Sequence, residues 1–531
     1  MPTATELNIN TSATANQMAQ EIFGDGTTVV SASYSGDGAS SGIYSGADTT
    51  VAGVAPADSG VILSTGHVAD FTNSSGSTNT NTSGNTSTNT SGTNGDSDFN
   101  AIAGAATYDA AFMEIDFIPD GDVLTLDFVL SSEEYPEFSN SQYNDVVGVW
   151  VNGVQAQVTI GDGSASIGNI NQNDTQNIYV DNTGDQYNTE MDGFTITLTF
   201  TAPVNAGEVN SIKIGVADVA DSSYDTNLLV AGGSVQTAFV AQDDQVDLSY
   251  NTTKTLDVLA NDADASGGTL TITHINDIAV TAGDTVTLAT GQEITLNPDG
   301  TLEVLSDGDD ETVYFNYTTE NDSGDSDTAL VEINQAQACF MAGTRIETEQ
   351  GPVAIENLEP GMMIQTYDNG FQPLRWIGHS QVPVTATTAP IRFAKGQFGA
   401  EADLWVSPNH RMLVTGQFAE LLFGEDEVLA KAKDLINDSS IRPDLSLARV
   451  DYYHLLFDQH EILTSHGVLS ESYHPGPQTT AGFDAETQAE LFALFPELCP
   501  KRGAGYGYAV RPALRQFEAK LLNTYLTSTA V

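Results

Sequence analysis

Short apolar runs alternate with polar turn clusters along most of the chain. In the first 240 residues, runs such as Thr28–Ser31, Val61–Leu63 and Val123–Leu126 are separated by clusters of Gly, Asp and Asn. Runs of this length between turn residues are typical of β-strands. From Phe194 to Phe200, apolar residues alternate with threonines, which predicts one half-buried strand. The pattern therefore predicts a β domain over residues 1–240.

One tract inside this region breaks the pattern. Residues 72–94 consist entirely of Ser, Thr, Asn and Gly. Because such a composition offers no apolar surface to bury, we expect a flexible loop there.

Residues 241–337 show a second set of short apolar runs. These runs lie at 246–248, 255–259, 270–273, 294–296, 313–317 and 329–333. About seven short strands in a segment of this size fit an immunoglobulin-like β-sandwich. We expect this unit to act as a spacer.

Residues 339–475 again read as short strands, and the pattern changes only in the tail, 476–531. Residues 484–495 and 510–525 are predicted to be helical. In the second helix, apolar side chains follow helical spacing: Leu514, Phe517, Leu521, Leu522 and Tyr525. We expect this tail to pack on the domain before it; a helix for export or for a partner is the alternative. The predicted fold class is mostly β: a β-sandwich head, an immunoglobulin-like spacer, an all-β domain and a short helical tail.

The charge of the chain changes at Cys339. Before this residue there are 2 basic and 49 acidic residues, and from it onward 14 basic and 23 acidic ones. A net charge of −56 argues against nucleic acid and against anionic membrane surfaces as partners. The hydrophobic fraction of 40% is enough for packed cores. We find no apolar stretch long enough to span a membrane, and residues 1–21 lack the features of a signal peptide.

Cys339 is one of two cysteines in the chain. A lone thiol at the first position of a new domain suggests a nucleophile that acts on the preceding peptide bond. The chain reads Cys-Phe-x-x-Gly-Thr from 339, then Ile-Glu-Thr at 346–348, Gly-Pro-Val-Ala-Ile-Glu at 351–356, Leu-x-Pro-Gly at 358–361 and Trp-Ile-Gly at 376–378. In the order and spacing of these elements, residues 339–475 resemble a bacterial Hint domain, the hedgehog/intein type. Met362 stands where the family often has Asp, a position that we expect to be structural.

This resemblance implies self-cleavage between Ala338 and Cys339. The cysteine sulfur would attack the Ala338 carbonyl and convert the amide into a thioester, for which a thiolate is suited. The departing nitrogen must gain a proton, and a histidine is the natural donor. Splicing inteins end in Asn before a nucleophile, and residues 470–476 hold no Asn. We therefore expect water, or an external amine or thiol as acyl acceptor, to resolve the thioester.

Six of the eight histidines follow Cys339, and the resemblance selects among them. Residues 406–413 match the Thr-x-x-His block, with Ser407 in the threonine place, so His410 is the expected acid at the amide nitrogen. Residues 453–462 resemble the late Hint block, which points to His460 as a second active-site histidine. His454 stands where inteins often carry Asp, and its role is less defined. For each the alternative is a structural histidine, the role that we expect for the histidines without a motif: His379, His466 and His474.

The first 240 residues resemble the choice-of-anchor L domain of bacterial surface proteins. The matching segments are Gly-Val-Ile-Leu-Ser-Thr-Gly at 60–66, Tyr-Asp-Ala-Ala at 108–111, Phe-Ile-Pro-Asp-Gly-Asp at 117–122, Ser-Ser-Glu-Glu-Tyr-Pro-Glu at 131–137 and Asn-Asp-Val at 144–146. The carboxylates of Glu133, Glu134 and Asp145, with Asp109, are candidate calcium ligands because calcium favours several oxygen ligands. The alternative is that they cap loops and face water, since no twelve-residue calcium loop is present.

In the spacer, Asp-Val-Leu-Ala-Asn-Asp at 257–262 resembles the cadherin-like repeats of bacterial adhesins. Asp262 and Asp264 are candidate calcium ligands at the domain edge. A turn in which the Asp side chains bond the backbone is at least as good an interpretation.

Together these resemblances predict an extracellular or cell-surface protein that cleaves itself rather than turning over a substrate, and that needs no cofactor for cleavage. An adhesin-like binding protein with an inactive Hint module is the alternative. A hydrolase in the N-terminal region is disfavoured because its histidines, His67 and His274, belong to no triad. The surface ligand and the acyl acceptor are not identified by the sequence.

Overall fold

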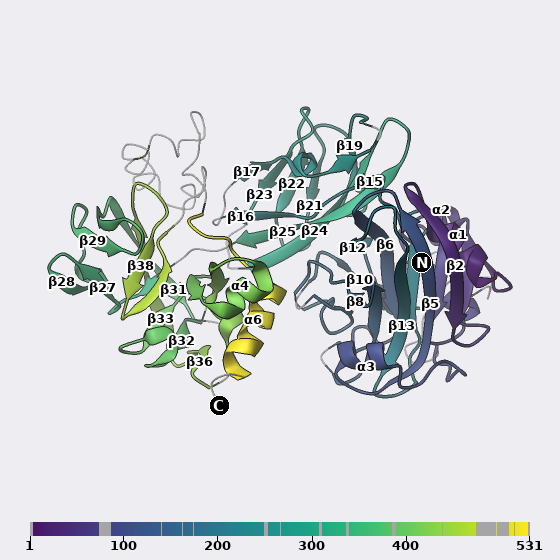
Figure 1. Cartoon of the computed structure of the whole chain (residues 1–531), viewed down its shortest axis with the longest axis horizontal. Coiled ribbons are helices and arrows are strands. Elements are labelled where there is room, and N and C mark those ends of the chain that lie inside the picture. Colours follow the sequence, from purple (N-terminus) through teal and green to yellow (C-terminus); the bar gives the residue numbers. More distant parts are fainter. Residues whose placement is uncertain are drawn as a thin grey trace. The chain divides into compact units, whose positions relative to one another are not determined.

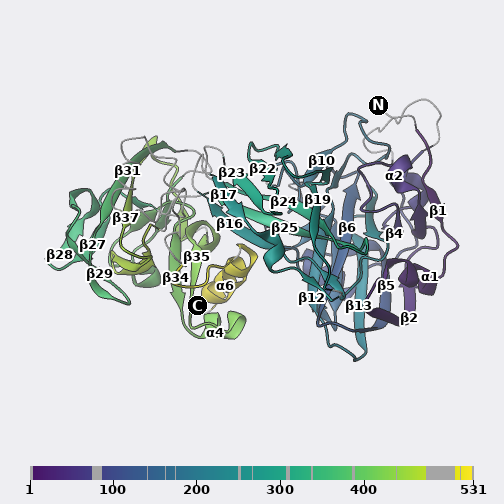
Figure 2. The same cartoon turned by 90° about the horizontal axis from the view of Figure 1, so that it is seen from above.

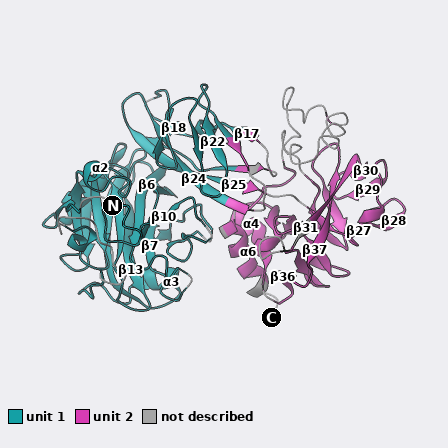
Figure 3. Cartoon of the chain, turned by 180° about the vertical axis from the view of Figure 1, so that it is seen from behind, with its two compact units in different colours: residues 1–245, 255–303, 313–332 teal, residues 246–254, 304–312, 333–531 magenta. Residues whose placement is uncertain are grey.

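The computed structural model describes most of the chain as two compact units. The described residues are 4–73, 86–139, 141–161, 163–173, 175–248, 253–265, 267–306, 311–335, 339–384, 389–437, 439–473, 495, 509–514 and 516–528. The first unit comprises residues 1–245, 255–303 and 313–332, and the second comprises residues 246–254, 304–312 and 333–531 (Figure 3). The prediction of a mostly β chain is confirmed.

The head of the first unit is a sandwich of two antiparallel sheets (Figure 1). The first sheet has the order β1 (Asn8–Asn10), β3 (Ser41–Ser45), β4 (Ser59–Ser64), β14 (Thr226–Ala231), β6 (Val123–Ser132), β11 (Gly193–Thr195) and β10 (Tyr179–Asp181), with β12 (Leu198–Pro203) also on β6. The second has the order β2 (Thr27–Ser35), β5 (Thr107–Pro119), β13 (Asn210–Val219), β7 (Val146–Val151) and β8 (Val154–Gln155), with β9 (Ala165–Ser166) on β7.

The central strands of the first sheet, β4, β14 and β6, are buried on both faces, which explains why they read as apolar runs. Successive side chains point to opposite faces, so Val61 and Leu63 enter the core between the sheets while Ile62 enters a second core on the outer face. Short helices cover the outer faces: α2 (Ala47–Thr50), the 3₁₀ turn η1 (Val68–Phe71) and α3 (Ser97–Ala103). Helix α1 (Ala15–Ile22) packs beside β2 and β4 (Figure 2). Its start is fixed by a capping box of Thr14 and Gln17.

Two details of the head differ from the sequence-based expectation. The strand predicted over 194–200 is broken at Ile196 and Thr197, because the Thr197 N–H donates to Asp277 Oδ2 at 2.8 Å instead of to a neighbouring strand. Within the polar tract 72–94, residues 86–94 are held by hydrogen bonds. The Thr90 N–H donates to Asp109 Oδ2 at 3.0 Å, and Thr93 bridges to Ala110. The expected flexibility therefore does not describe this end of the tract.

The spacer strands form two larger sheets and a small one. The first has the order β16 (Asp244–Leu248), β25 (Ser326–Gln335), β24 (Glu311–Glu320), β19 (Thr271–Ile275) and β20 (Ile278–Ala279). The second has the order β17 (Thr253–Leu256), β23 (Leu302–Leu305), β22 (Glu293–Leu296) and β21 (Thr285–Thr287), and β15 (Phe239–Val240) pairs with β18 (Ala263–Asp264). The 3₁₀ turn η2 (Val258–Ala260) follows β17. The strands predicted from the apolar runs are present, with the run 255–259 ending in this turn.

The rest of the second unit consists of two sheets around one core. The first has the order β31 (Trp376–Pro383), β37 (Arg449–Leu456), β26 (Phe340–Met341), β33 (Leu404–Val406), β32 (Ile391–Phe393) and β36 (Ile441–Pro443). The second has the order β28 (Gly351–Ala354), β27 (Arg345–Thr348), β29 (Met363–Thr366), β38 (Ile462–Ser465), β39 (Val468–Glu471), β34 (Arg411–Thr415) and β35 (Glu427–Lys431), with β30 (Gly370–Pro373) on β29. Its short helical segments are η3 (Ile355–Asn357), η4 (Gln397–Gly399), α4 (Gln417–Phe423) and η5 (Ala432–Leu435).

The C-terminal tail returns to this unit. Helix α6 (Gln516–Ser528) packs against α4, β35 and η5. It begins later than the predicted 510, because residues before it bond to β35 in strand fashion: the Leu514 N–H donates to the Leu429 carbonyl at 2.8 Å. Almost all of the helix predicted at 484–495 lies outside the described residues. Among the described residues, no helix is long and apolar enough to cross a membrane.

Candidate active site

The position of β26 brings the predicted residues together. Phe340, directly after Cys339, pairs with Val406 of β33 on one side and with Tyr453 of β37 on the other. Because β26 lies between these strands, the residues that follow Val406 and Tyr453, namely Ser407 and His454, come next to Cys339. A chain separation of more than a hundred residues is closed in this way by sheet pairing.

Cys339 is 3% exposed, and its atoms contact two polar side chains. Its Sγ lies 3.5 Å from Nδ1 and 3.8 Å from Nε2 of His454. Its backbone N–H donates to Ser407 Oγ at 3.1 Å, and its carbonyl accepts from the Ser407 N–H at 3.0 Å. The thiol and the amide nitrogen that would be separated from Ala338 therefore each touch a group able to exchange a proton. Ala338 itself lies outside the described residues.

His410 is fully buried beneath the first residue of β26. Its ring lies edge-to-face against Phe340 with centroids 4.5 Å apart, and neither ring nitrogen has a hydrogen-bond partner in the described part of the chain. Burial lowers the pKa of His410 to about 4, an effect that the nearby Glu471 carboxylate only partly offsets. At neutral pH this imidazole is therefore uncharged and carries one N–H.

Sequence reasoning missed Glu471, which organises the polar side of the site. β39 pairs with β34, Met412 opposite Ser470, and this register places Glu471 beside Arg411. Glu471 Oε1 accepts from the Arg411 N–H at 2.9 Å, and Oε2 lies 3.4 Å from His460 Nε2. Burial raises the pKa of Glu471, but the charge of Arg411 and the contact with His460 outweigh this and hold the pKa below its usual value. In the sequence, the only signal for this contact was the opposite charge of Glu471 and Arg411, and the pairing of β39 with β34 was not predicted.

His460 thus contacts Glu471. The remaining histidines serve elsewhere: His379 Nε2 contacts Asp451 Oδ1 at 3.0 Å on an exposed surface, and His466 Nδ1 contacts the Asp403 carbonyl at 3.0 Å. His474 lies outside the described residues. Of the five residues predicted to be catalytic, the structure therefore joins Cys339, Ser407 and His454 directly.

The carboxylates expected to bind calcium in the head are deeply buried. Glu133 and Glu134 follow β6, Asp145 precedes β7, and each is at most 1% exposed. Burial raises the pKa of Glu133 to about 9, and burial together with the nearby Asp145 raises that of Glu134 to about 10. Asp218, which the sequence did not single out, is buried beside Asp145, and its pKa lies well above the ordinary value for the same reason. Asp109 instead accepts from the Thr90 N–H.

These side chains do not form a ready-made metal site. No three His, Cys, Asp or Glu side chains within the described ranges are arranged to hold a metal ion. In the spacer, Asp262 Oδ1 accepts from the Gln242 N–H at 2.8 Å and from the Tyr317 hydroxyl at 3.0 Å, while Asp264 Oδ2 accepts from the Gly268 N–H at 2.9 Å. Calcium binding at either place therefore stays a prediction.

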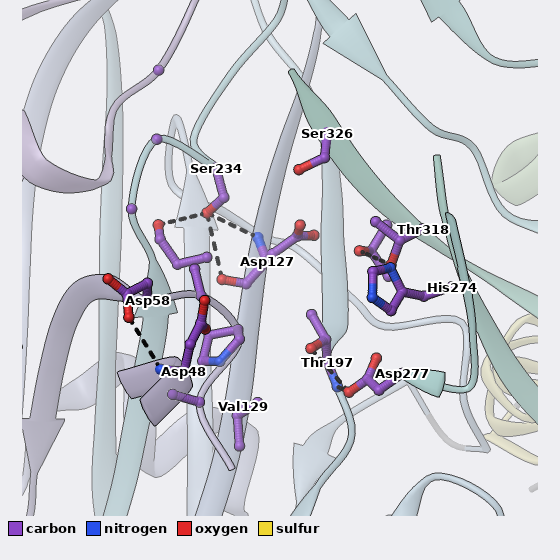
Figure 4. Close-up of a pocket in the computed structure, with 18 of the residues that line it drawn as sticks. Asp48, Asp58, Asp127, Val129, Thr197, Ser234, His274, Asp277, Thr318 and Ser326 are labelled. Carbon is purple, nitrogen blue, oxygen red and sulfur yellow. Dashed lines mark hydrogen bonds between the residues drawn. The ribbon is translucent and has the colours of Figure 1, made fainter. Parts of the chain in front are cut away.

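A separate cavity of about 690 Å³ lies in the first unit (Figure 4). Acidic side chains and one histidine line it, among them Asp48, Asp58, Asp127, Asp277 and His274. Two hydrogen bonds connect residues that line this cavity (Figure 4). The Thr197 N–H donates to Asp277, and the Asp127 N–H donates to Ser234 Oγ at 3.2 Å. Such a lining disfavours anionic ligands, and none of the residues around Cys339 contributes to it.

Three family models match the chain, one for each of these regions. The model of the choice-of-anchor L domain matches residues 6–236, that of a bacterial Ig domain residues 236–334, and that of the Hint domain residues 338–477. The chain thus carries a choice-of-anchor L domain, a bacterial Ig domain and a Hint domain, in that order. The Hint domain contains the whole arrangement around Cys339, and its match ends at residue 477, at the start of the C-terminal tail. No curated protein sequence matches the chain.

Solved structures with similarity to the chain include two inteins. The AceL NrdHF class 3 split intein, a glutathione-linked splice-inactive variant, is 18% identical over 25% of this chain and 97% of its own, with a TM-score of 0.18. The gp41-1 intein is 11% identical over 25% of this chain and 98% of its own, with a TM-score of 0.17. The M60 catalytic domain with two CBM51 domains of Clostridium perfringens ZmpB is 8% identical over 84% of this chain and 43% of its own, with a TM-score of 0.13.

Proposed function

We propose that the Hint domain cleaves its own chain between Ala338 and Cys339 by an N-to-S acyl shift. Cys339 Sγ attacks the Ala338 carbonyl carbon, a C–S bond forms, and the C–N bond to Cys339 breaks. The product is a thioester that joins residues 1–338 to the cysteine side chain. Water, or an external amine or thiol, then takes the acyl group and releases the N-terminal part.

The observation that carries this proposal is the pair of contacts at Cys339. The Cys339 thiol lies against His454, which can take its proton. The Cys339 N–H, whose nitrogen must become an amine, donates a hydrogen bond to Ser407 Oγ. Sulfur needs this help because a buried thiol is a weaker nucleophile than its thiolate. An adhesin with a degenerate Hint module would have no need to keep both contacts.

The protons balance within the site. His454 receives one proton from Cys339 Sγ, and the leaving nitrogen needs one, so the shift itself takes none from solvent. His410, uncharged at neutral pH, acts in this proposal as a hydrogen-bond donor to the leaving nitrogen rather than as a free imidazolium. This modifies the role expected for His410 from the sequence.

The choice-of-anchor L and bacterial Ig domains support a place outside the cell or on its surface. In that setting, cleavage would release the N-terminal part or transfer it to a surface acceptor. Self-cleavage is a single event per chain, and no cofactor takes part in the steps described.

Intact-mass analysis of the purified full chain tests the proposal. The parent should yield residues 1–338 and 339–531, and hydroxylamine should speed the release because it attacks thioesters. Cys339→Ala should remain uncleaved. His410→Ala should slow cleavage by about 10²–10⁴-fold, the usual cost of losing a group that assists proton transfer.

His379→Ala is the matched control, because the His379 side chain is half-exposed and contacts Asp451 and the ring of Tyr453 at the surface. It should cleave like the parent. Cleavage of Cys339→Ala at the parental rate would exclude the thioester route, and equal rates for the His410 and His379 variants would remove the role of His410.

A further inference from the structure

The C-terminal segment 509–514 is bound to the Hint domain by several kinds of contact. The Leu429 N–H donates to the Pro512 carbonyl and the Leu514 N–H to the Leu429 carbonyl, both at 2.8 Å, so the segment runs parallel to β35. Arg511 forms ion pairs with Glu427 at 2.6 Å and with Asp368 at 2.7 Å. Three apolar side chains of the tail enter the Hint core: Leu514, Ala519 and Leu522. The tail is thus part of this folded unit although it lies beyond the matched residues.

One contact of this segment reaches a buried histidine. The Val510 N–H donates to His460 Nδ1 at 3.1 Å, and His460 is only 3% exposed. A nitrogen that accepts a hydrogen bond carries no proton, so the neutral ring must hold its proton on Nε2. That nitrogen lies 3.4 Å from Glu471 Oε2. The backbone of the tail therefore selects the tautomer that presents an N–H to Glu471.

Glu471 passes this arrangement on to the residue beside His410. Its Oε1 accepts from the Arg411 N–H at 2.9 Å, which fixes the start of β34 directly after His410. Its Oε2 lies 3.7 Å from Arg411 Nη1. A carboxylate at 2% exposure depends on these donors, because a buried charge without them is strongly disfavoured. Each step from Val510 to Arg411 is a direct contact.

We propose that segment 509–514 is a positioning element of the autoprocessing site, in which the Val510 N–H orients His460, His460 orients Glu471, and Glu471 holds the His410–Arg411 backbone. The proposal rests on the proposed self-cleavage for its activity readout. It assigns no chemical step to Val510, His460 or Glu471.

The test is to remove the Val510 N–H while keeping an apolar side chain. In the full chain, Val510→Pro lacks the N–H, and Val510→Ala keeps it. We expect Val510→Pro to cleave at least tenfold more slowly and Val510→Ala to cleave like the parent. Thermal unfolding of both in a Cys339→Ala background shows whether the Pro variant is folded.

A second measurement separates positioning from general destabilisation. In the folded, uncleaved Cys339→Ala chain, ¹⁵N NMR should show His460 protonated on Nε2, and Val510→Pro should abolish this preference. His460→Leu should slow cleavage, and Val510→Pro added to it should cost nothing more, because the two changes break one path.

The outcomes distinguish the two proposals. If the parent does not cleave but His460 shows the selected tautomer only when the Val510 N–H is present, self-cleavage fails and the positioning by the tail stands. An unchanged tautomer in Val510→Pro, or additive effects of Val510→Pro and His460→Leu, would overturn the positioning proposal. If Val510→Pro does not fold, the remaining variants and the NMR spectrum of the parent still test the positioning proposal. Parental cleavage by His460→Leu, or a parental His460 protonated on Nδ1, would contradict the proposal, and Val510→Ala remains the control that keeps the N–H.

Discussion

Buried carboxyl groups in the head and in the Hint domain behave in opposite ways. Glu134 in the head and Glu471 in the Hint domain are 1% and 2% exposed. Burial and the neighbouring Asp145 together raise the pKa of Glu134 to about 10. Burial also acts on Glu471, yet Arg411 and His460 hold its pKa below the usual value. One carboxyl group is therefore protonated at neutral pH and the other is charged.

The difference follows from what each part of the chain offers as a partner. Desolvation disfavours the charged form of any carboxyl, and only a nearby cation or strong donors reverse this. The part before Cys339 has 2 basic residues for 49 acidic ones, whereas the rest has 14 for 23. Buried carboxyl groups of the head are thus protonated, whereas Glu471 of the Hint domain is a buried carboxylate. The ratio of basic to acidic residues in each part of the chain therefore bears on the protonation state of its buried carboxyl groups.

The largest expected effect comes from removing the partner of Glu471. Arg411→Met should destabilise the Hint domain by about 3–5 kcal/mol, because it leaves a buried carboxylate without its cation. The pKa of Glu471 should rise, and cleavage should slow as the His410 backbone loosens. Calorimetry of the Cys339→Ala chain with and without Arg411→Met measures the loss.

Arg442→Met is the control for this change, since Arg442 is exposed on β36. It should leave the unfolding of the Hint domain unchanged. Adding Glu471→Gln to Arg411→Met should recover part of the stability, because the amide carries no charge. Equal melting temperatures of the Arg411→Met and Arg442→Met variants would show that Glu471 does not depend on Arg411, and the contrast between Glu471 and the carboxyl groups of the head would then be wrong.

The next prediction concerns the pH dependence of the head. Its buried carboxyls bind protons in the folded state that an unfolded chain releases above the ordinary glutamate pKa of about 4.3. The free energy of unfolding should therefore fall as pH rises from about 5 toward 9 or 10. Each such group contributes up to about 1.4 kcal/mol per pH unit. Thermal unfolding of the Cys339→Ala chain across this range records the slope.

Glu134→Gln sharpens this prediction, because glutamine keeps the shape and cannot ionise. It should melt like the parent near pH 5 and above the parent near pH 9. Glu114→Gln, at an exposed position of β5, should follow the parent at both values. If the free energy of unfolding of the head rises with pH, as it does for a carboxylate paired with a cation, the buried carboxyl groups are not protonated in the folded state and the prediction is wrong.

The sequence predicted some of these elements for identifiable reasons. A short apolar run marked β4, because its successive side chains enter two different cores and must all be apolar. The break in the strand over 194–200 was hidden, since it depends on Asp277 far along the chain. Cys339, Ser407 and His454 were identified through a family resemblance. Glu471 and Val510 carry no local signal, as their roles arise only from the pairing of β39 with β34 and from the return of the tail.

The smallest expected effect is that of calcium on the head. Several buried carboxyl oxygens there have no hydrogen-bond donor among the described residues, including Glu134 Oε2 and Asp218 Oδ1. A divalent ion that displaced protons from them would bind the folded state and raise its melting temperature. The rise should be modest, because the side chains would have to rearrange around the ion. Melting in calcium and in magnesium at equal ionic strength, with a chelator control, measures it, and identical curves would leave only screening.

The end of β25 limits what can reach the proposed thioester. This strand ends at Gln335, and Ala338 is the third residue after it. An extended chain spans about 3.3–3.6 Å per residue, so the acyl carbon of Ala338 is tethered within about 11 Å of the last residue of the sheet. If the thioester forms as proposed, an incoming nucleophile must reach a carbon held this close to the sheet. We therefore expect small amines and thiols to react with the thioester faster than macromolecular acceptors do. The length of the tether would then act as a steric filter on the choice of acceptor.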